Sequence, residues 1–282
     1  MTLSTYPQIF QLEVTSVCNL RCTMCPYSMI TRPKQHISWE LLHKVRMYTI
    51  PGDKLGLHVM GEPLLHPDIV AIVAFFSGAG ILPELATNGT IMSESLANSL
   101  IDVGLHEIWF SFDAGSKELY ESIRVGATFE RVVKNVKMFL DINIARGSPV
   151  QAVVQKVGPT TDDADDFLKL WEGYDARVKF MDSWAGTMNL DKIEKPPEVR
   201  TPCAEPWNRV AVLVNGDVVP CCRDWEPKYV YGNLNEMNLY HIWRSARARA
   251  LRYDMQYGVY SIEPCASCNE WNIEMDRNVV EV

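Results

Sequence analysis

The sequence has no long apolar run and no basic segment leading into one. Its longest apolar stretch, residues 69–76, is far shorter than the ~20 residues that cross a bilayer. The first residues also lack the charged and apolar regions of a secretory signal peptide. We therefore expect a cytoplasmic protein without a membrane partner. Because disulfides are rare in that compartment, the eight cysteines are better interpreted as metal ligands.

Basic residues are not in excess either. The 27 Lys and Arg residues are outnumbered by 35 Asp and Glu residues, which gives a net charge of −8. This balance argues against a nucleic-acid partner, because phosphate-binding surfaces are usually basic. It is compatible with a small polar substrate that carries positive charge. Internal repeats and low-complexity segments are also absent. A length of 282 residues allows one large α/β domain or one domain plus a smaller appendage.

Apolar runs and helix signals alternate along the first 180 residues. We expect strands over residues 9–14, 55–59, 84–87, 107–112, 150–157 and 177–180. The predicted helices between them cover residues 39–48, 68–76, 93–104, 129–142 and 162–171. Strands that alternate with helices in this way form right-handed parallel βαβ units. The alternation stops at residues 183–202, whose glycine and prolines predict a linker.

Three cysteines, Cys18, Cys22 and Cys25, lie within eight residues directly after the first predicted strand. Three soft thiolates on one tight loop suit an iron–sulfur cluster better than zinc, which usually takes paired C-x-x-C knuckles and a fourth ligand nearby. No fourth ligand is nearby in the sequence. One iron of a four-iron cube would therefore stay open, and an open iron can bind a small chelating molecule.

The spacing C-x-x-x-C-x-x-C resembles that of the radical S-adenosylmethionine (SAM) superfamily, in which the open iron binds the amino and carboxylate groups of SAM. Met24 departs from the usual pattern, which has an aromatic residue before the third cysteine, but methionine also packs well in such places. The resemblance implies a partial (β/α)6 barrel, in agreement with the strand count.

The same resemblance implies SAM contacts at the carboxyl ends of the strands, where α/β proteins bind ligands. Met60-Gly61-Glu62-Pro63 resembles the Gly-Gly-Glu motif that binds the SAM amino group, with Met60 in place of the first glycine. A surface turn is the alternative interpretation. Asn88 follows the third strand, and small polar side chains there can hydrogen-bond a ribose or a carboxylate.

Further SAM contacts are implied at the fourth and fifth strands. Ser111 and Asp113 lie at the ribose-binding motif, and Arg124 would meet the SAM carboxylate. A surface position is the alternative for Arg124. One of Gln155 and Lys156 must point into the barrel, where it would contact SAM or substrate.

The other five cysteines follow the linker: Cys203, Cys221, Cys222, Cys265 and Cys268. Asn215-Gly216 between two apolar runs predicts a β-hairpin with Cys221 at its end. A four-cysteine zinc site is one interpretation. The flanking sequence instead resembles the SPASM/twitch extension of radical SAM enzymes, and no further cysteines follow.

This second resemblance implies the shorter twitch form, a β-hairpin plus helix. Its four cysteines Cys203, Cys221, Cys265 and Cys268 would ligate one auxiliary [4Fe-4S] cluster. Cys222 is then not a ligand. The expected organisation is a radical SAM barrel in residues 1–182, a linker in 183–202 and the twitch domain in 203–282.

This architecture resembles aminocyclitol (deoxy-scyllo-inosamine) dehydrogenases and aminoglycoside epimerases of antibiotic biosynthesis. The resemblance implies hydrogen abstraction from a carbon of a polyhydroxylated amine and oxidation of an alcohol to a ketone, with electrons for SAM cleavage from a flavodoxin- or ferredoxin-type donor. Redox-neutral epimerisation with Cys222 as hydrogen donor is one alternative, and radical modification of a peptide or protein side chain is another. Cys222 could also be a structural thiol or replace Cys221 as a ligand.

Overall fold

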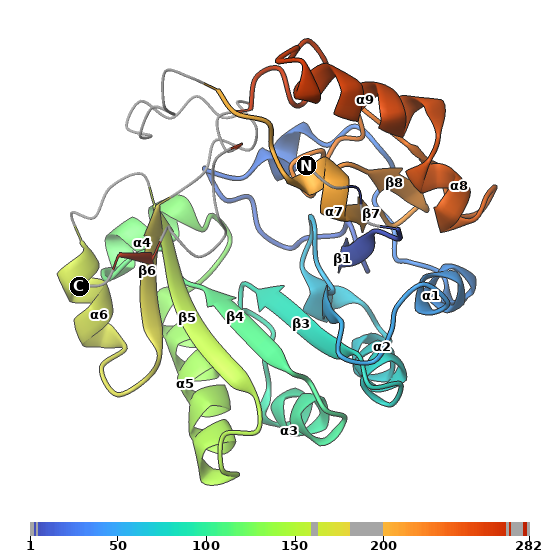
Figure 1. Cartoon of the computed structure of the whole chain (residues 1–282). Coiled ribbons are helices and arrows are strands. Elements are labelled where there is room, and N and C mark those ends of the chain that lie inside the picture. Colours follow the sequence, from blue (N-terminus) through green and yellow to red (C-terminus); the bar gives the residue numbers. More distant parts are fainter. Residues whose placement is uncertain are drawn as a thin grey trace.

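Figure 1 shows the computed structural model of the chain, which describes residues 3, 5–158, 163–180, 200–268, 271 and 279–280. Six parallel strands lie side by side in sequence order: β1 (Gln8–Leu12), β2 (Lys54–Gly56), β3 (Leu82–Thr87), β4 (Glu107–Ser111), β5 (Gln151–Gly158) and β6 (Ala176–Phe180). The sheet curves but does not close, which confirms the predicted partial barrel.

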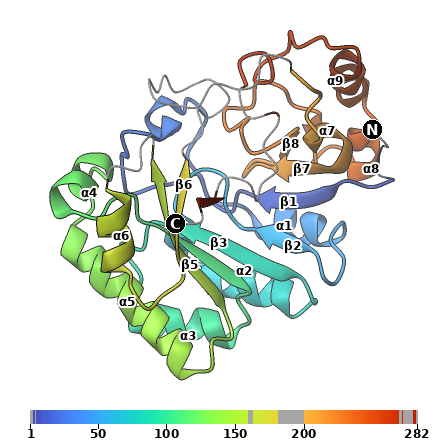
Figure 2. The ribbon, with the colours of Figure 1, turned by 60° about the vertical axis from the view of Figure 1, so that its left-hand side comes forward.

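The helices between these strands cover the outer face of the sheet (Figure 2). They are α1 (Trp39–Arg46), α2 (Ile69–Ser77), α3 (Glu94–Asp102), α4 (Lys117–Ile123), α5 (Phe129–Ala145) and α6 (Ala164–Leu170). Ser38 caps α1 as predicted, because its hydroxyl accepts from the backbone N–H of Leu41 at 3.2 Å. Short α4, between β4 and α5, has no counterpart among the predicted helices. Every second residue of the strands packs against this helical layer and forms the main core.

The C-terminal part continues the same sheet. The predicted hairpin is confirmed as β7 (Arg209–Val212) and β8 (Asp217–Val219), joined through Gly216 at φ +92°. Strand β7 pairs in parallel with β1, and the two-residue β9 (Gly232–Asn233) adds to β8. Helices α7 (Glu205–Asn208), α8 (Leu239–Trp243) and α9 (Ala246–Gln256) accompany this hairpin.

A last short strand, β10 (Val279–Val280), returns to the barrel and pairs antiparallel with β6. The complete order is β10-β6-β5-β4-β3-β2-β1-β7-β8-β9. The predicted boundary at residue 203 is therefore crossed by one continuous sheet. Of the predicted linker, residues 183–199 lie outside the described residues. Within the described ranges, no helix combines the length and the apolar character that crossing a membrane requires.

Candidate active site

The cysteine loop follows β1 at the carboxyl edge of the sheet. Cys18 and Cys25 pack with Met60 and Tyr27 in a small buried cluster, which Trp225 of the C-terminal part completes. The Tyr27 hydroxyl accepts from the backbone N–H of Cys18 at 2.8 Å, so this buried ring fixes the start of the loop. Met60, at the position of the first glycine in the resembled motif, thus belongs to the apolar cluster against which Cys18 and Cys25 pack.

The loop thiols fit a metal cluster chemically. Burial raises the pKa of Cys18 to about 11 and that of Cys25 to about 12, and the pKa of Cys22 is raised for the same reason. Such thiols are protonated at neutral pH unless a metal binds and stabilises the thiolate. Three half-buried thiols on one loop are therefore suited to iron ligation and poorly suited to act as free nucleophiles.

Gly61 allows the next loop to lie against the cysteine segment. Its φ is +83°, and a Cβ at this position would stand 2.5 Å from the carbonyl oxygen of Thr15. The neighbouring backbone N–H of Glu62 donates to the carbonyl of Val17 at 2.8 Å. A glycine is thus required here both by the backbone angle and by close approach.

The Glu62 carboxylate is buried and already holds three donors. It accepts from the hydroxyl of Thr87 at 2.6 Å and from the backbone N–H groups of Asn88 at 2.7 Å and Leu64 at 3.1 Å, just after Pro63. Burial raises the pKa of Glu62, which these hydrogen bonds oppose. Glu62 therefore ties the Gly61–Pro63 loop to the end of β3, and its direct contact with a SAM amino group stays a prediction.

Asn88 connects the end of β3 to the cysteine loop. Its amide donates to the side-chain oxygen of Asn19 at 3.0 Å, and Asn19 donates to the hydroxyl of Thr90 at 2.8 Å. The Asn88 oxygen accepts from the backbone N–H of Thr90 at 3.0 Å. Asn19 and Thr90 were not among the predicted site residues, although both lie within two residues of one.

Arg124 lies inside the site, not on the surface. Its guanidinium pairs with the fully buried carboxylate of Asp113, and its Nη1 lies 3.7 Å from the Sγ of Cys22. Although burial works against the charge, the Asp113 carboxylate raises the pKa of Arg124. The Asp113 carboxylate also accepts from the backbone N–H of Val157 at 2.9 Å. Asp113 thus orients Arg124, and its predicted ribose contact remains a prediction.

The pairing register of β4 and β5 decides which of Gln155 and Lys156 points into the barrel. Gln155 is the Cα partner of Ser111, and both lie on the face opposite to the helix-packed Phe110 and Val154. Lys156 is buried on the other face, where it pairs with Asp163 and donates to the carbonyl of Asp113 at 3.0 Å. Gln155 is therefore the residue of the two that points into the barrel.

The C-terminal cysteines line one cavity. All four predicted ligands line it: Cys203, Cys221, Cys265 and Cys268. Burial raises the pKa of Cys203 and of Cys265 to about 12 and that of Cys221 well above its ordinary value. Cys222 is not among the described residues of the lining. The cavity fits a group that takes four thiolates.

Arg200, at the end of the predicted linker, fixes the last cysteine pair. Its guanidinium donates to the carbonyl of Cys265 at 2.6 Å and lies 4.0 Å from the ring centre of Tyr260. The sequence gives no local signal for this role, because the arginine and its partner carbonyl are 65 positions apart.

A buried ion pair joins the two cysteine sites. The Glu13 carboxylate accepts from Arg32 at 2.8 and 2.5 Å, from the backbone N–H of Met60 at 3.3 Å and from that of Val214 at 3.0 Å. Arg32 also donates to the carbonyl of Trp225 at 3.0 Å. The Gly61 loop, the cysteine loop and the C-terminal hairpin therefore all depend on this pair.

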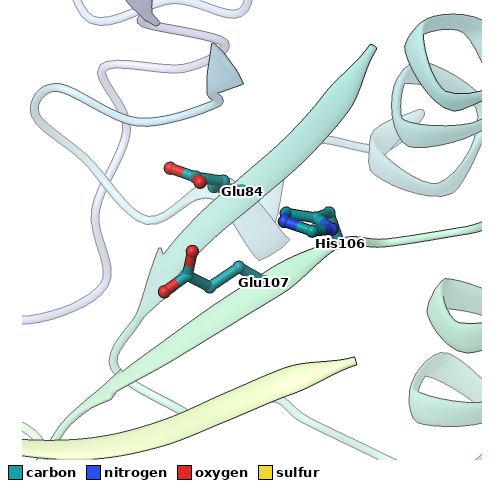
Figure 3. A group of neighbouring side chains, drawn as sticks. All are labelled: Glu84, His106 and Glu107. Carbon is teal, nitrogen blue, oxygen red and sulfur yellow. The ribbon is translucent and has the colours of Figure 1, made fainter. Parts of the chain in front are cut away.

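Three potential metal ligands also lie close together outside the cysteine sites. In the described part of the chain, the ligand atoms of Glu84, His106 and Glu107 all lie within 4.8 Å of one another (Figure 3).

The negative charge of the Glu84 and Glu107 carboxylates in Figure 3 is partly neutralised by Lys54. The Lys54 ammonium lies 2.9 Å from Glu84 and 3.0 Å from Glu107, so a cation at this point would displace it. These residues lie toward the amino ends of β3 and β4, away from the cysteine loop.

Comparison with known proteins supports both cysteine sites. A family model described as the radical SAM superfamily matches residues 12–170, and one described as an iron–sulfur cluster-binding domain, SPASM, matches residues 203–269. The S-adenosyl-L-methionine-dependent 2-deoxy-scyllo-inosamine dehydrogenase of Niallia circulans is 23% identical over 279 residues, which cover 95% of each chain.

Two solved structures share the fold. BtrN in complex with AdoMet and 2-DOIA has a TM-score of 0.68 at 20% identity, and the match covers 99% of this chain and 100% of BtrN. Streptococcus suis SuiB bound to the precursor peptide SuiA has a TM-score of 0.70 at 14% identity, covering 95% of this chain and 70% of SuiB.

Proposed function

The chain belongs to the radical SAM superfamily, and from this premise we propose that it oxidises one hydroxyl group of an aminocyclitol-type substrate to a ketone. SAM and a [4Fe-4S] cluster are the cofactors of the radical SAM domain, and the SPASM domain adds a further iron–sulfur cluster. When bound, these cofactors supply a 5′-deoxyadenosyl radical that takes a hydrogen atom from carbon and an acceptor for the second electron. The hydroxyl proton leaves to solvent, so the alcohol loses two hydrogens in all.

One observation carries the proposal. The 2-deoxy-scyllo-inosamine dehydrogenase matches this chain almost end to end, with 95% of each chain covered. SuiB, whose structure contains a precursor peptide, is matched over 70% of its length. The match to the dehydrogenase thus extends over nearly all of that enzyme, which supports a substrate of the same small, polar class.

The residues take the following parts in the proposal. Cys18, Cys22 and Cys25 ligate the first cluster, and Arg124 beside Cys22 holds the SAM carboxylate, with Asp113 fixing its guanidinium. Gly61 and its neighbours Glu62 and Pro63 bind the SAM methionyl group, with Asn88 holding the adjoining loop.

The ribose of SAM lies against Ser111, on the inner face of β4. Cys203, Cys221, Cys265 and Cys268 ligate the auxiliary cluster and leave it no open iron. A flavodoxin- or ferredoxin-type protein donates the electron that starts each turnover.

The direct test uses anaerobically reconstituted protein, a reductant, SAM and 2-deoxy-scyllo-inosamine labelled with deuterium at the carbinol carbon. The proposal predicts a ketone, with the deuterium transferred to 5′-deoxyadenosine in equal amount. Recovery of substrate with one inverted centre would favour epimerisation. Cleavage of SAM without any change in this substrate or in related amino polyols would reject the proposed substrate class.

A further inference from the structure

The guanidinium group of Arg200 belongs to the wall of the cavity that the C-terminal cysteines line. Arg200 lies three residues before Cys203, and both residues are part of the lining. The two terminal nitrogens of the guanidinium are held by backbone carbonyls. Nη2 donates to the carbonyl of Cys265 at 2.6 Å, and Nη1 donates to that of Ala266 at 3.4 Å. The edge of the group is thus fixed to the segment that carries the last cysteine pair.

Two aromatic rings hold the same guanidinium from its face. Its central carbon lies 4.0 Å from the ring centre of Tyr260 and 6.0 Å from that of Trp271, which also lines the cavity. Contacts between a guanidinium and aromatic faces are attractive and restrict the side chain. The positive charge of Arg200 is therefore held at one place beside the cysteines.

The remaining nitrogen of this group has no partner. Within the described residues, Nε of Arg200 is shielded from solvent and forms no hydrogen bond. In that same part of the chain, no carboxylate forms an ion pair with Arg200. A shielded donor without an acceptor is unfavourable, and so is a charge without a counter-charge. An iron–sulfur cluster in the cavity would supply both, because its sulfur atoms accept hydrogen bonds and it carries negative charge.

The other charged residues of the lining do not cancel the charge of Arg200. Glu205 is the acidic residue of the described lining, and its carboxylate pairs with Arg209, whose Nε donates to it at 2.6 Å. Arg223 adds a second positive side chain. Five further lining residues are apolar: Pro206, Pro220, Met255, Pro264 and Trp271. In such surroundings a charge acts more strongly than it does in water.

A fixed positive charge affects how readily an iron–sulfur cluster accepts an electron. Reduction adds one negative charge to the cluster, so a nearby positive charge stabilises the reduced form. Hydrogen bonds to the sulfur atoms also set the reduction potential. In the proposed function, the substrate radical becomes a ketone when it loses one proton to solvent and one electron to the auxiliary cluster. A one-electron carrier protein of the flavodoxin or ferredoxin type then removes that electron.

We propose that Arg200 donates a hydrogen bond from Nε to a sulfur atom of the auxiliary cluster and that its charge raises the reduction potential of this cluster. The inference rests on the proposed function, in which the cluster accepts an electron from the substrate radical. It gives the unpartnered Nε an acceptor, and it makes the transfer of that electron more favourable.

The first test measures the reduction potential of the auxiliary cluster by redox titration and electron paramagnetic resonance. Full-length reconstituted protein is used, and the variant that lacks Cys18, Cys22 and Cys25 identifies the signal of the second cluster. Arg200→Gln removes the charge, so the ratio of reduced to oxidised cluster at a fixed potential should fall about tenfold, which is about 59 mV for one electron. Arg200→Lys keeps the charge and should stay within about threefold of wild type.

The matched control removes the same charge from a surface position. Arg249 is exposed on α9, the helix that contributes Met255 to the cavity lining. Arg249→Gln should change the ratio of reduced to oxidised cluster less than about twofold, because water and salt screen an exposed charge. The iron content of all these variants should equal that of wild type.

A second measurement tests the hydrogen bond in the wild-type protein. In protein labelled with 15N-arginine, pulsed electron paramagnetic resonance of the reduced auxiliary cluster should show a 15N coupling through the N–H···S contact. The coupling should be lost in Arg200→Lys and kept in Arg223→Lys, which replaces the other arginine of the lining. A wild-type spectrum without this coupling would reject the hydrogen bond.

The outcomes separate this inference from the function on which it rests. Full iron content with equal potentials in wild type and Arg200→Gln rejects the role of Arg200 and leaves the proposed function standing. An equal lowering in Arg200→Gln and Arg200→Lys would reflect the lost bond to the Cys265 carbonyl and also rejects it. If wild type forms no second cluster, the inference and the proposed function both fail. If Arg200→Gln does not hold the cluster, the 15N coupling in wild type and its loss in Arg200→Lys decide.

Discussion

The two cysteine sites of this molecule are built in opposite ways. The first takes three thiols from one loop of eight residues, and Arg124 faces it from the end of α4. The second draws four thiols from three segments spread over residues 203–268 and encloses them in one cavity. The first site therefore combines three ligands with a charged group suited to an anionic molecule. At the second site, all four thiols are predicted to bind the metal group.

This difference assigns different work to the two sites. A cluster with three protein ligands keeps a position for SAM, whereas a cluster with four can exchange electrons but cannot bind substrate directly. The Glu13–Arg32 pair links the two regions, because it hydrogen-bonds to Met60 before Gly61 and to Val214 of the C-terminal hairpin. The predictions below test this division of work.

The largest effect should come from replacing Cys18, Cys22 and Cys25 together with Ala. SAM cleavage should be abolished, because no other described group near the loop offers three thiolates. About four irons should remain bound at the second site. Iron analysis and a 5′-deoxyadenosine assay measure both results. Replacing Cys265 and Cys268 with Ala should keep SAM cleavage but lose ketone formation. Retained SAM cleavage in the variant that lacks Cys18, Cys22 and Cys25 would contradict their assignment as ligands of the first cluster.

Breaking the Glu13–Arg32 ion pair, which links the two sites, should have the next largest effect. Glu13→Gln leaves Arg32 without its buried counter-charge, so we expect a loss of about 3 kcal/mol in unfolding free energy. Urea unfolding of the reconstituted protein, followed by tryptophan fluorescence, measures it. Arg146→Met removes the exposed pair with Asp102 and should cost about 0.5 kcal/mol or less. Equal effects of the two changes would mean that the buried pair does not hold the sites together.

Removing the charge that faces the first site should weaken SAM binding specifically. Arg124→Met should lower SAM affinity about 10- to 100-fold, since hydrogen bonds to charged groups contribute roughly 1.5–3 kcal/mol. Asp113→Asn should act in the same direction through the orientation of Arg124. Equilibrium binding of SAM to the reconstituted protein measures this, and unchanged iron content is the control. Normal SAM affinity in Arg124→Met would remove Arg124 from the site.

Cys222→Ala should have the smallest effect. If the reaction is oxidation, no thiol donor is needed, and ketone formation should stay within about twofold of wild type. Product made in deuterium oxide should carry no deuterium at the reacting carbon. Solvent deuterium at an inverted carbon, lost in Cys222→Ala, would instead identify Cys222 as a hydrogen donor and the enzyme as an epimerase.

The sequence predicted the parts of the site whose signals are local. Cysteine spacing, the Asn215-Gly216 turn and the alternation of strands and helices are each encoded in a few neighbouring residues, and the structure confirms the hairpin and the strand order. The motif residues at strand ends were also predictable, because parallel strands bring their carboxyl ends to one edge.

The remaining features depend on contacts between distant segments. The bond from Val214 to Glu13 spans 201 positions, and that from Arg32 to Trp225 spans 193. The continuation of the barrel sheet into β7 likewise has no local pattern. The bonds from Thr87 and Asn88 to the Glu62 carboxylate were not predictable either, because they join the end of β3 to another loop; the predicted contact of Glu62 with an ammonium stays a prediction.

The central claim is that one site has an open iron and the other does not. Mössbauer spectroscopy of 57Fe-reconstituted protein tests it directly, with and without SAM. We expect SAM to change the signal of one iron in wild type and of none in the variant that lacks Cys18, Cys22 and Cys25, whose remaining cluster should be a [4Fe-4S] centre. Stoichiometric zinc in place of iron in that variant, or a SAM-dependent change in its spectrum, would contradict the account.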